Sequence, residues 1–319
     1  MTAPPATPIR GRYAPSPTGA LHLGNLRTAL LAWLFARHAG GVFVLRVEDL
    51  DLPRVRSGAT SRMLADLRWL GLDWDEGPGP GGPYGPYFQS ARQALYDAAL
   101  ARLRAAALVY PCYCTRAELA RLASAPQQGD EQPRYPGTCR DLTPAERHAR
   151  EASGRSPALR FRAPAAPITF RDTLRGQQTE SVAETAGDLL VRRSDGIVAY
   201  QLAVVVDDAL MGITQVVRGD DLLSSTARQL ALYAALGYPP PRVYVHVPLA
   251  LDATGARMAK RDASAGLDPL RGSGAIPEDV LGLLAASCGL WPAGAPATLS
   301  DLLAAFEPAR ISSGVAFLA

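Results

Sequence analysis

The first 70 residues alternate between strand and helix patterns, and this alternation constrains the fold more than any other feature of the chain. Residues 11–15 have the composition of a short strand, and residues 26–39 place apolar side chains along one stripe of a helix. A second strand is predicted over 42–49 and a second helix over 58–70. Strands that alternate with helices pair in parallel, so the sequence predicts an α/β fold with a doubly wound parallel sheet.

Further along the chain, this pattern is interrupted and then resumes. After a predicted helix over 90–107, a segment with three cysteines, a polar stretch and scattered prolines indicates an inserted subdomain. The alternation returns with strand-like stretches at 197–210 and 213–221, a helix over 224–236 and a strand over 243–249. The predicted division is the first half of a Rossmann-like catalytic domain (1–107), an inserted subdomain (108–195), the second half of the catalytic domain (196–265) and a small helical C-terminal region (266–319).

The turn between the first strand and the first helix is APSPTGALHLGN, residues 14–25. Ligands of doubly wound sheets bind beyond the C-terminal ends of the strands, where this turn lies. Free N–H groups and the helix dipole favour a phosphate there; His22 can hydrogen-bond its oxygens, and Gly24 lets a flat base approach the backbone. Asn25 is the expected N-cap of the helix. The alternative is that His22 is a surface residue in a loop shaped by prolines.

Two other phosphate-binding patterns are excluded. GPGPGG, residues 77–82, matches G-x-G-x-x-G as a string, but no strand precedes it and the following PYGPY cannot begin a helix. The chain also contains no G-x-x-x-x-G-K-[ST] loop. A protein of this sequence that uses ATP must therefore bind it in another way.

The basic residues are almost all arginine. Of 33 lysine and arginine residues only Lys260 is a lysine, within RMAKR at 257–261. Either a compact ammonium group is needed at that position, or one lysine survived by chance. The net charge of +3 is too small by itself to indicate nucleic-acid binding.

Three of the four cysteines indicate a metal site. On extended backbone, Cys112 and Cys114 point the same way, and Cys139 follows across the polar stretch. Three thiolates leave one tetrahedral position, for which His148 or water are candidates on chemistry alone. So few cysteines, and the absence of a signal sequence or a long apolar run, predict a cytoplasmic protein with no membrane partner.

The remaining cysteine and histidines have simpler interpretations. Cys288 lies in the apolar stretch LLAASCGLW and is expected in the core. No catalytic partner is evident in the sequence for His38, His148 or His246.

The turn at 14–25 together with RMAKR resembles the paired HIGH and KMSKS motifs of class I aminoacyl-tRNA synthetases. RVEDLD, GLDWDEGP and PYFQS are similar to the glutamyl branch of that family, and the resemblance extends from about residue 10 to about residue 265. Lys260 matches the lysine that contacts ATP on the KMSKS loop of the family. Arg257 stands in place of the first lysine of that motif and Ala259 in place of its serine, so we expect loop dynamics or turnover to differ from those of relatives.

The resemblance implies that a carboxylate of glutamate attacks the α-phosphorus of ATP, which is bound with magnesium, so the protein mainly positions reactants and neutralises negative charge. Arginine can hold a carboxylate through two parallel hydrogen bonds, which suits Arg12 and Arg218, whereas an internal ion pair with Arg46 is the alternative role of Glu48. The implied glutamate-binding residues are Arg12, Tyr13, Ala14, Pro15, Ser16, Glu48, Tyr200 and Arg218. The implied ATP-binding residues are His22, Gly24, Asn25 and Lys260, of which His22 and Lys260 are catalytic, and the implied ligands of one structural zinc ion are Cys112, Cys114, Tyr135 and Cys139.

Within the glutamyl branch, the few residues that follow RMAKR make the chain similar to a truncated paralogue group without the anticodon-binding region. That group attaches glutamate to queuosine in the anticodon loop of tRNA(Asp). We therefore expect a monomeric ligase whose partners are L-glutamate, ATP and queuosine-containing tRNA(Asp). Two alternatives stay open: a compact glutamyl-tRNA synthetase that charges a tRNA 3′ end, and a catalytically silent RNA-binding paralogue. No stretch of the sequence reads as a base-recognition code.

Overall fold

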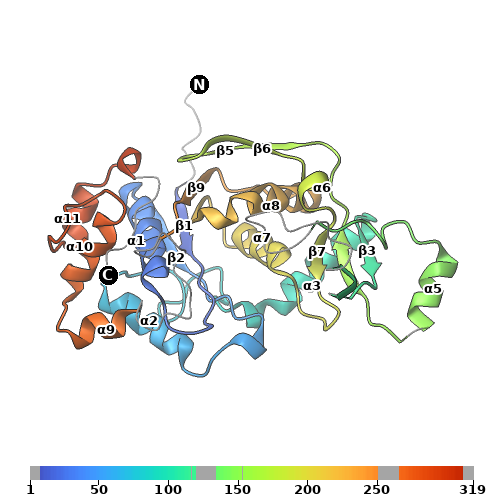
Figure 1. Ribbon diagram of the computed structural model, residues 1–319, viewed down its shortest axis with the longest axis horizontal. Coiled ribbons are helices and arrows are strands. Elements are labelled where there is room, and N and C mark those ends of the chain that lie inside the picture. The colour runs from blue at the N-terminus through green and yellow to red at the C-terminus, as the bar shows by residue number, and fades with distance from the viewer. Residues whose placement is uncertain (1–7, 116, 120–133, 153, 251–265, 312–319) are drawn as a thin grey trace.

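Figure 1 shows the computed structural model of the chain as an elongated molecule built around one large sheet. The structure describes residues 8–115, 117–119, 134–152, 154–250 and 266–311. No described helix is both long enough and apolar enough to cross a membrane.

The large sheet has the strand order β2-β1-β8-β9-β5-β6. Its first five strands pair in parallel, and β6 is antiparallel to β5 at one edge. This confirms the predicted α/β fold with a parallel sheet. The strands are β1 (Arg10–Tyr13), β2 (Val42–Leu45), β5 (Ile168–Asp172), β6 (Gly176–Glu180), β8 (Gln215–Gly219) and β9 (Val243–Val247).

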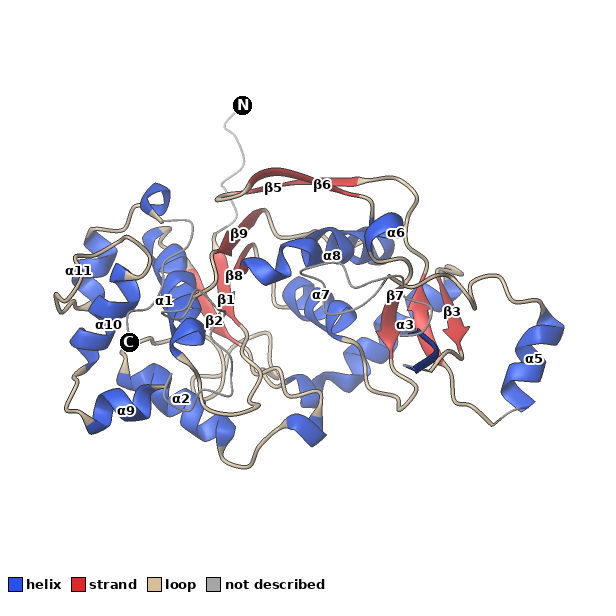
Figure 2. Cartoon of the chain, viewed as in Figure 1, coloured by secondary structure: helices blue, strands red, loops and turns tan. Residues whose placement is uncertain are grey.

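Helices lie on both sides of this sheet (Figure 2). Successive side chains of each strand point to opposite faces, so each face packs against its own set of helices. Leu45, Val217 and Val245 belong to a core that they share with α1 (Leu23–His38), α2 (Ala59–Trp69), α9 (Leu267–Gly272), α10 (Pro277–Ala286) and α11 (Leu299–Ala304). A second core joins α3 (Gln93–Ala105), α6 (Val182–Thr185), α7 (Tyr200–Leu210) and α8 (Leu223–Leu236). Short 3-10 turns occupy Leu52–Arg54, Gln89–Arg92, Asp220–Leu222 and Pro308–Arg310.

A second, antiparallel sheet lies beyond α7 and α3 (Figure 2). Its strands are β3 (Val109–Cys112), β4 (Ala158–Phe161) and β7 (Leu189–Arg192), in the order β3-β4-β7, and α5 (Pro144–Ala152) lies at that end of the molecule. The β5–β6 hairpin lies between β4 and β7 in sequence but joins the large sheet. The segment 108–195 therefore contributes to both sheets, and its treatment as one subdomain stays a prediction.

The start of α1 differs from the prediction. The helix begins at Leu23 rather than at residue 26, and His22, not Asn25, is its N-cap residue. The imidazole Nδ1 atom of His22 accepts the backbone N–H of Asn25 at 3.2 Å, which satisfies one of the N–H groups that a helix N-terminus leaves without a partner. Asn25 is the third residue of the helix, and its backbone carbonyl accepts a hydrogen bond from Tyr13 at 3.2 Å.

The predicted strand at 197–210 is wrong, because most of that stretch forms helix α7. The run Val204–Val206 favours a strand by local propensity, and periodicity cannot distinguish a short buried strand from a buried helix. Tertiary contacts decide the outcome: the helix is buried from Leu202 to Asp208 and packs against α8 and α3.

Candidate active site and metal centre

The turn before α1 holds His22 in one orientation. Because Nδ1 accepts the N–H of Asn25, the neutral ring carries its proton on Nε2, and an Nε2–H can donate to a phosphate oxygen. Gly24 packs tightly here: a Cβ atom at this position would lie 3.0 Å from His22 Nδ1 and 3.3 Å from the Cβ atom of Ala250. The turn therefore combines a hydrogen-bond donor, a helix N-terminus and a close backbone approach, which together suit a phosphate group.

The segment that contains Lys260 begins and ends beside this turn. Lys260, Arg257 and Ala259 themselves lie outside the described residues. Ala250, the last described residue before them, contacts the Gly24 position, and Gly266, the first described residue after them, forms an isolated antiparallel bridge with His22. The chain thus leaves and returns at the same place, at the N-terminus of α1.

A buried cluster of charges lies at the C-terminal end of β1. Asp208 on α7 accepts hydrogen bonds from Arg46 Nη1 at 2.6 Å and from Arg12 Nε at 3.3 Å. Arg46 Nη2 also donates to Glu48 Oε1 at 3.1 Å, so the internal ion pair considered for Glu48 is present. Burial raises the pKa of the Glu48 carboxyl above its ordinary value, although Arg46 and Arg12 oppose this effect. Burial would also raise the pKa of Asp208, but Arg12 and Arg46 hold it below its ordinary value.

The backbone hydrogen bonding between β1 and β2 continues beyond the C-terminal ends of both strands. Arg46 N donates to Tyr13 O at 3.0 Å, and Glu48 N donates to Pro15 O at 2.9 Å. Tyr13 is buried in the core, and Ala14 continues the chain toward Ser16. Ser16 and Glu48 then line a cavity of about 120 Å³, together with Thr18, Asp51, Arg54 and Val55.

Tyr200 and Arg218 extend this cluster from α7 and β8. Tyr200, the first residue of α7, is 37% exposed. The pKa of its hydroxyl is raised, first by burial of that end of the side chain; Glu48 also raises it, whereas Arg218 and Arg12 lower it. All three charged groups therefore lie within electrostatic reach of the Tyr200 hydroxyl. Of the predicted glutamate-binding residues, the structure thus brings Arg12, Glu48 and Arg218 close to Tyr200.

Arg218 differs from the other arginines of the cluster because all its hydrogen-bond partners are neutral. Nε donates to His246 at 3.0 Å, Nη1 to Gln229 at 2.8 Å, and Nη2 to Thr226 and to the carbonyl of Leu222. Only 5% of this residue is exposed, and none of the described salt bridges includes it. A buried guanidinium without a carboxylate partner is a place where an anionic ligand gains most. One N–H of Nη1 remains for that ligand.

Several residues that support this cluster were missed by the sequence analysis. Asp207 is fully buried and accepts hydrogen bonds from Arg92 at 2.6 Å, from Gln89 at 2.7 Å and from Tyr96. Two adjacent aspartates inside an apolar run were the available signal, but a strand would have pointed them to opposite faces. His246 also has partners, Asp172 and Arg218, that are distant from it in sequence.

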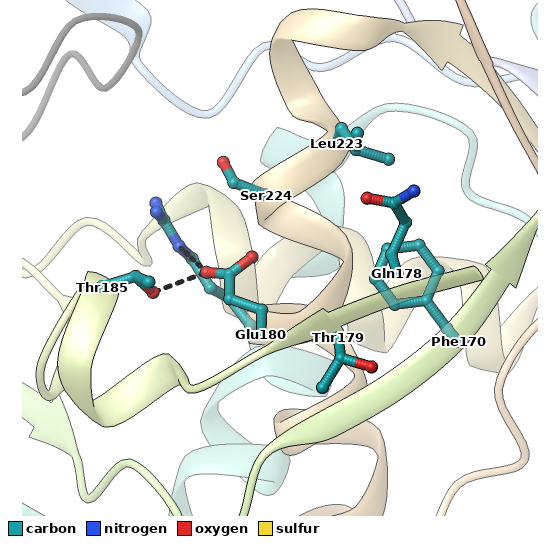
Figure 3. Close-up of a pocket in the computed structure, with 8 residues that line it drawn as sticks. Phe170, Gln178, Thr179, Glu180, Thr185, Leu223 and Ser224 are labelled. Atoms are coloured by element: carbon teal, nitrogen blue, oxygen red, sulfur yellow. Dashed lines mark hydrogen bonds and ion pairs between the residues drawn. The ribbon is translucent and has the colours of Figure 1, made fainter. Parts of the chain in front are cut away.

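Another cavity, with a volume of about 270 Å³, lies between the β5–β6 hairpin and α8 (Figure 3). Glu180 points toward Thr185 and accepts its hydroxyl at 2.6 Å, while Arg228 lies 3.9 Å from the same carboxylate. These two charges neutralise each other, and none of the predicted site residues lines this cavity. It is therefore not the candidate active site.

The three predicted cysteine ligands come together at the end of β3. The sulfur atoms of Cys112, Cys114 and Cys139 all lie within 4.8 Å of one another. The Tyr135 hydroxyl lies 3.4 Å from the Cys112 sulfur and accepts the backbone N–H of Cys139 at 2.8 Å. Among the described residues no histidine joins this group, so the geometry does not favour His148 as the fourth ligand.

The chemistry of this cluster fits a thiophilic divalent cation such as zinc. Burial, followed by the neighbouring Cys112 thiolate, raises the pKa of the Cys114 thiol to about 12. A cation bound between the sulfurs would remove that repulsion and release the proton. Arg160 also approaches the group, with Nε 3.4 Å from the Cys112 sulfur and its guanidinium 3.7 Å from the centre of the Tyr135 ring.

Cys288 and His38 have structural surroundings. Cys288 is fully buried, as expected, and accepts a hydrogen bond from Arg27 Nε at 3.1 Å. His38 packs edge-on against Phe306 with ring centres 5.4 Å apart.

Comparisons with known proteins identify the family of the chain. Residues 8–294 match the family described as tRNA synthetases class I (E and Q), catalytic domain. A protein of Symbiobacterium thermophilum named glutamyl-Q tRNA(Asp) synthetase is 56% identical over 302 residues, which cover 94% of this chain and 93% of the relative. Glutamate–tRNA ligase 1 of Halorhodospira halophila is 47% identical over 306 residues, which cover 96% of this chain and 64% of the ligase. The crystal structure of glutamate-tRNA synthetase from Elizabethkingia anophelis matches with a TM-score of 0.83 and 30% identity, covering 98% of this chain and 68% of that one.

Proposed function

The chain belongs to the class I tRNA synthetases for glutamate and glutamine, and we propose that it activates L-glutamate with ATP and transfers the glutamyl group to queuosine in the anticodon loop of tRNA(Asp). Membership of this family implies an ATP-dependent ligase that acts on glutamate, ATP and tRNA. The observation that carries the choice of queuosine is the high identity, over nearly the whole of both chains, to a relative named glutamyl-Q tRNA(Asp) synthetase.

Glutamate binding is assigned to the buried charge cluster. Free glutamate has two carboxylates and one ammonium group, so its site needs two cationic groups and an anionic one. Arg12 and Arg218 supply the cations, and Glu48 supplies the carboxylate for the ammonium group. The described hydrogen bonds of Arg12 use Nε and one N–H of Nη1, which leaves Nη2 and the second Nη1 hydrogen for a bidentate contact. Arg218 retains a single N–H and contributes mainly its charge.

ATP binding is assigned to the turn before α1. The Nε2–H of His22 donates to a phosphate oxygen, and the helix N-terminus at Gly24 favours the same negative charge. The N–H of Asn25 is held by His22, so Asn25 contributes by fixing the imidazole. Lys260 belongs to the segment that begins and ends beside His22, so its ammonium group is assigned to the phosphates. Magnesium, when bound with ATP, neutralises further charge on the phosphates.

The reaction then proceeds in two substitutions. A carboxylate oxygen of glutamate forms a bond to the α-phosphorus of ATP, and the bond from that phosphorus to pyrophosphate breaks. A hydroxyl of queuosine next attacks the glutamyl carbonyl, loses its proton, and AMP leaves. The protein contributes orientation and positive charge to the first step, in which the phosphates carry the developing charge.

The metal site is assigned a structural role. Cys112, Cys114, Cys139 and Tyr135 would hold zinc, which joins β3 to the chain segment that returns after the polar stretch. A bound zinc ion would supply folding free energy to this end of the molecule.

The decisive assay measures transfer of labelled glutamate to tRNA(Asp) with and without queuosine, next to exchange of labelled pyrophosphate into ATP in the absence of tRNA. The proposal expects glutamate-dependent exchange without tRNA and transfer only to the modified tRNA. Transfer to the 3′ end of unmodified tRNA(Glu) would favour the compact glutamyl-tRNA synthetase instead. No exchange at all would favour the silent RNA-binding paralogue.

A further inference from the structure

Arg218 is held by a buried histidine that the proposed mechanism does not use. His246 on β9 is 0% exposed, and Asp172 at the end of β5 is 1% exposed. Nδ1 of His246 lies 2.7 Å from Asp172 Oδ2, and Nε2 of the same ring lies 3.0 Å from Nε of Arg218. The three side chains form one continuous series of hydrogen bonds that crosses from β5 through β9 to β8.

The direction of each hydrogen bond follows from the groups involved. A guanidinium has only donors, so Nε2 of His246 accepts from Arg218; an ionised carboxylate only accepts, so Nδ1 donates to Asp172. Burial lowers the pKa of His246, which agrees with a neutral ring. Burial would raise the pKa of Asp172, but the hydrogen bond from His246 holds it below its ordinary value, which agrees with an ionised carboxylate.

Asp172 cannot easily turn away from this position. Its Oδ1 atom accepts the backbone N–H groups of Leu174 at 2.9 Å and Arg175 at 2.8 Å, and its Oδ2 atom accepts the backbone N–H of His246 at 3.0 Å. The carboxylate is thus fixed by three backbone donors before it receives the imidazole. A fixed acceptor on one side of the ring sets the ring orientation, and therefore sets where Nε2 meets Arg218.

We infer that Asp172 and His246 are positioning residues that orient the guanidinium of Arg218 and thereby set the affinity for glutamate. The inference rests on the proposed role of Arg218 in binding a carboxylate of glutamate. His246 fixes the Nε edge of the guanidinium, while Gln229 and Thr226 fix the opposite nitrogens, so the one remaining N–H of Nη1 has a defined direction. Without the contact at Nε, the guanidinium is free to move until glutamate binds. Binding must then order the side chain, and the lost conformational entropy weakens the affinity for glutamate.

Two variants of His246 separate the contact of Nδ1 with Asp172 from the contacts of Nε2 with Arg218 and with the Thr226 hydroxyl, which lies 3.2 Å away. The amide of His246→Asn reaches the position of Nδ1 and keeps a donor for Asp172, but it no longer reaches Arg218. The amide of His246→Gln reaches the position of Nε2 and keeps an acceptor for Arg218, but it loses the donor to Asp172. We expect His246→Asn to raise the glutamate KM in pyrophosphate exchange about 10-fold or more, the usual effect of losing a hydrogen bond to a charged group, and His246→Gln to raise it less. The ATP KM should change less than about twofold in both.

A purely structural role predicts a different result, in which both variants lower the melting temperature and neither changes the glutamate KM relative to the ATP KM. An unchanged glutamate KM in folded His246→Asn protein would therefore overturn the inference. Combining His246→Asn with Arg218→Lys provides an independent check, because residues that act through each other give non-additive effects; additive effects would also overturn it. If the His246 variants fail to fold, Asp172→Asn is expected to raise the glutamate KM selectively as well. An unchanged glutamate KM in Asp172→Asn protein would count against the positioning role of Asp172 and His246. If the wild-type protein shows no glutamate-dependent pyrophosphate exchange, both the proposed function and this positioning role are refuted.

Discussion

Replacing Asp208 by asparagine tests the buried charge cluster, because this change preserves the shape of the side chain and removes its charge. Asp208 lies between Arg12 and Arg46. The side chains of Asp208 and Arg12 are each 4% exposed, and that of Arg46 is fully buried. Its carboxylate receives the 2.6 Å hydrogen bond from Arg46 and the 3.3 Å contact from Arg12. In the variant, two buried guanidinium groups lose their shared counterion.

Breaking a buried ion pair by removing one partner costs about 3–5 kcal/mol of unfolding free energy. In a chain of this size we therefore expect Asp208→Asn to lower the melting temperature by about 10 °C, using about 2–4 °C per kcal/mol. The glutamate KM should also rise, because Arg12 loses the negative charge that orients it. Differential scanning calorimetry measures the first effect and pyrophosphate exchange the second.

The matched control is Asp141→Asn. Asp141 accepts a hydrogen bond from Arg162 at 3.1 Å, but 80% of its side chain is exposed, so the pair contributes about 0–1 kcal/mol. If Asp208→Asn melts within about 2 °C of the wild type, as the control is expected to do, then water reaches the cluster and the argument from burial is wrong.

Three further predictions concern separate parts of the molecule. Chelation or Cys114→Ser is expected to lower the melting temperature, since a bound metal supplies folding free energy, and a wild-type preparation that contains no metal and melts unchanged after chelation would contradict the site. Lys260→Ala should slow glutamate-dependent pyrophosphate exchange by about 1.5–3 kcal/mol in activation free energy, and an unaffected rate would refute its assigned role. Because burial lowers the pKa of His246 below its ordinary 6.5, the unfolded chain binds more protons than the folded one just below that pH. The contribution of His246 to stability is therefore complete above pH 6.5 and is lost as the pH falls, and denaturant titrations should show that His246→Gln flattens this dependence.

The sequence determined the local elements that carry the motifs. Alternating strand and helix patterns in the first 70 residues are sufficient to predict β1, α1, β2 and α2, because a parallel pair requires a crossover helix. The lone Lys260 and the turn at 14–25 were each visible without a structure. Spacing also indicated a site of three cysteines, because two side chains two residues apart on extended backbone share one face.

Tertiary structure decided which charges meet. Asp208 pairs with Arg12 and Arg46 across 196 and 162 residues of sequence, and no local pattern encodes contacts of that length. Burial also reversed the local preference of Val204–Val206, since a helix could enclose its apolar side chains while it directed Asp207 and Asp208 to arginines. The sequence by itself predicted a nucleotide-binding turn and showed a family resemblance, because both depend on neighbouring residues. Only the folded chain left Arg218 buried among neutral partners, because that isolation depends on where β5, β8, β9 and α8 pack.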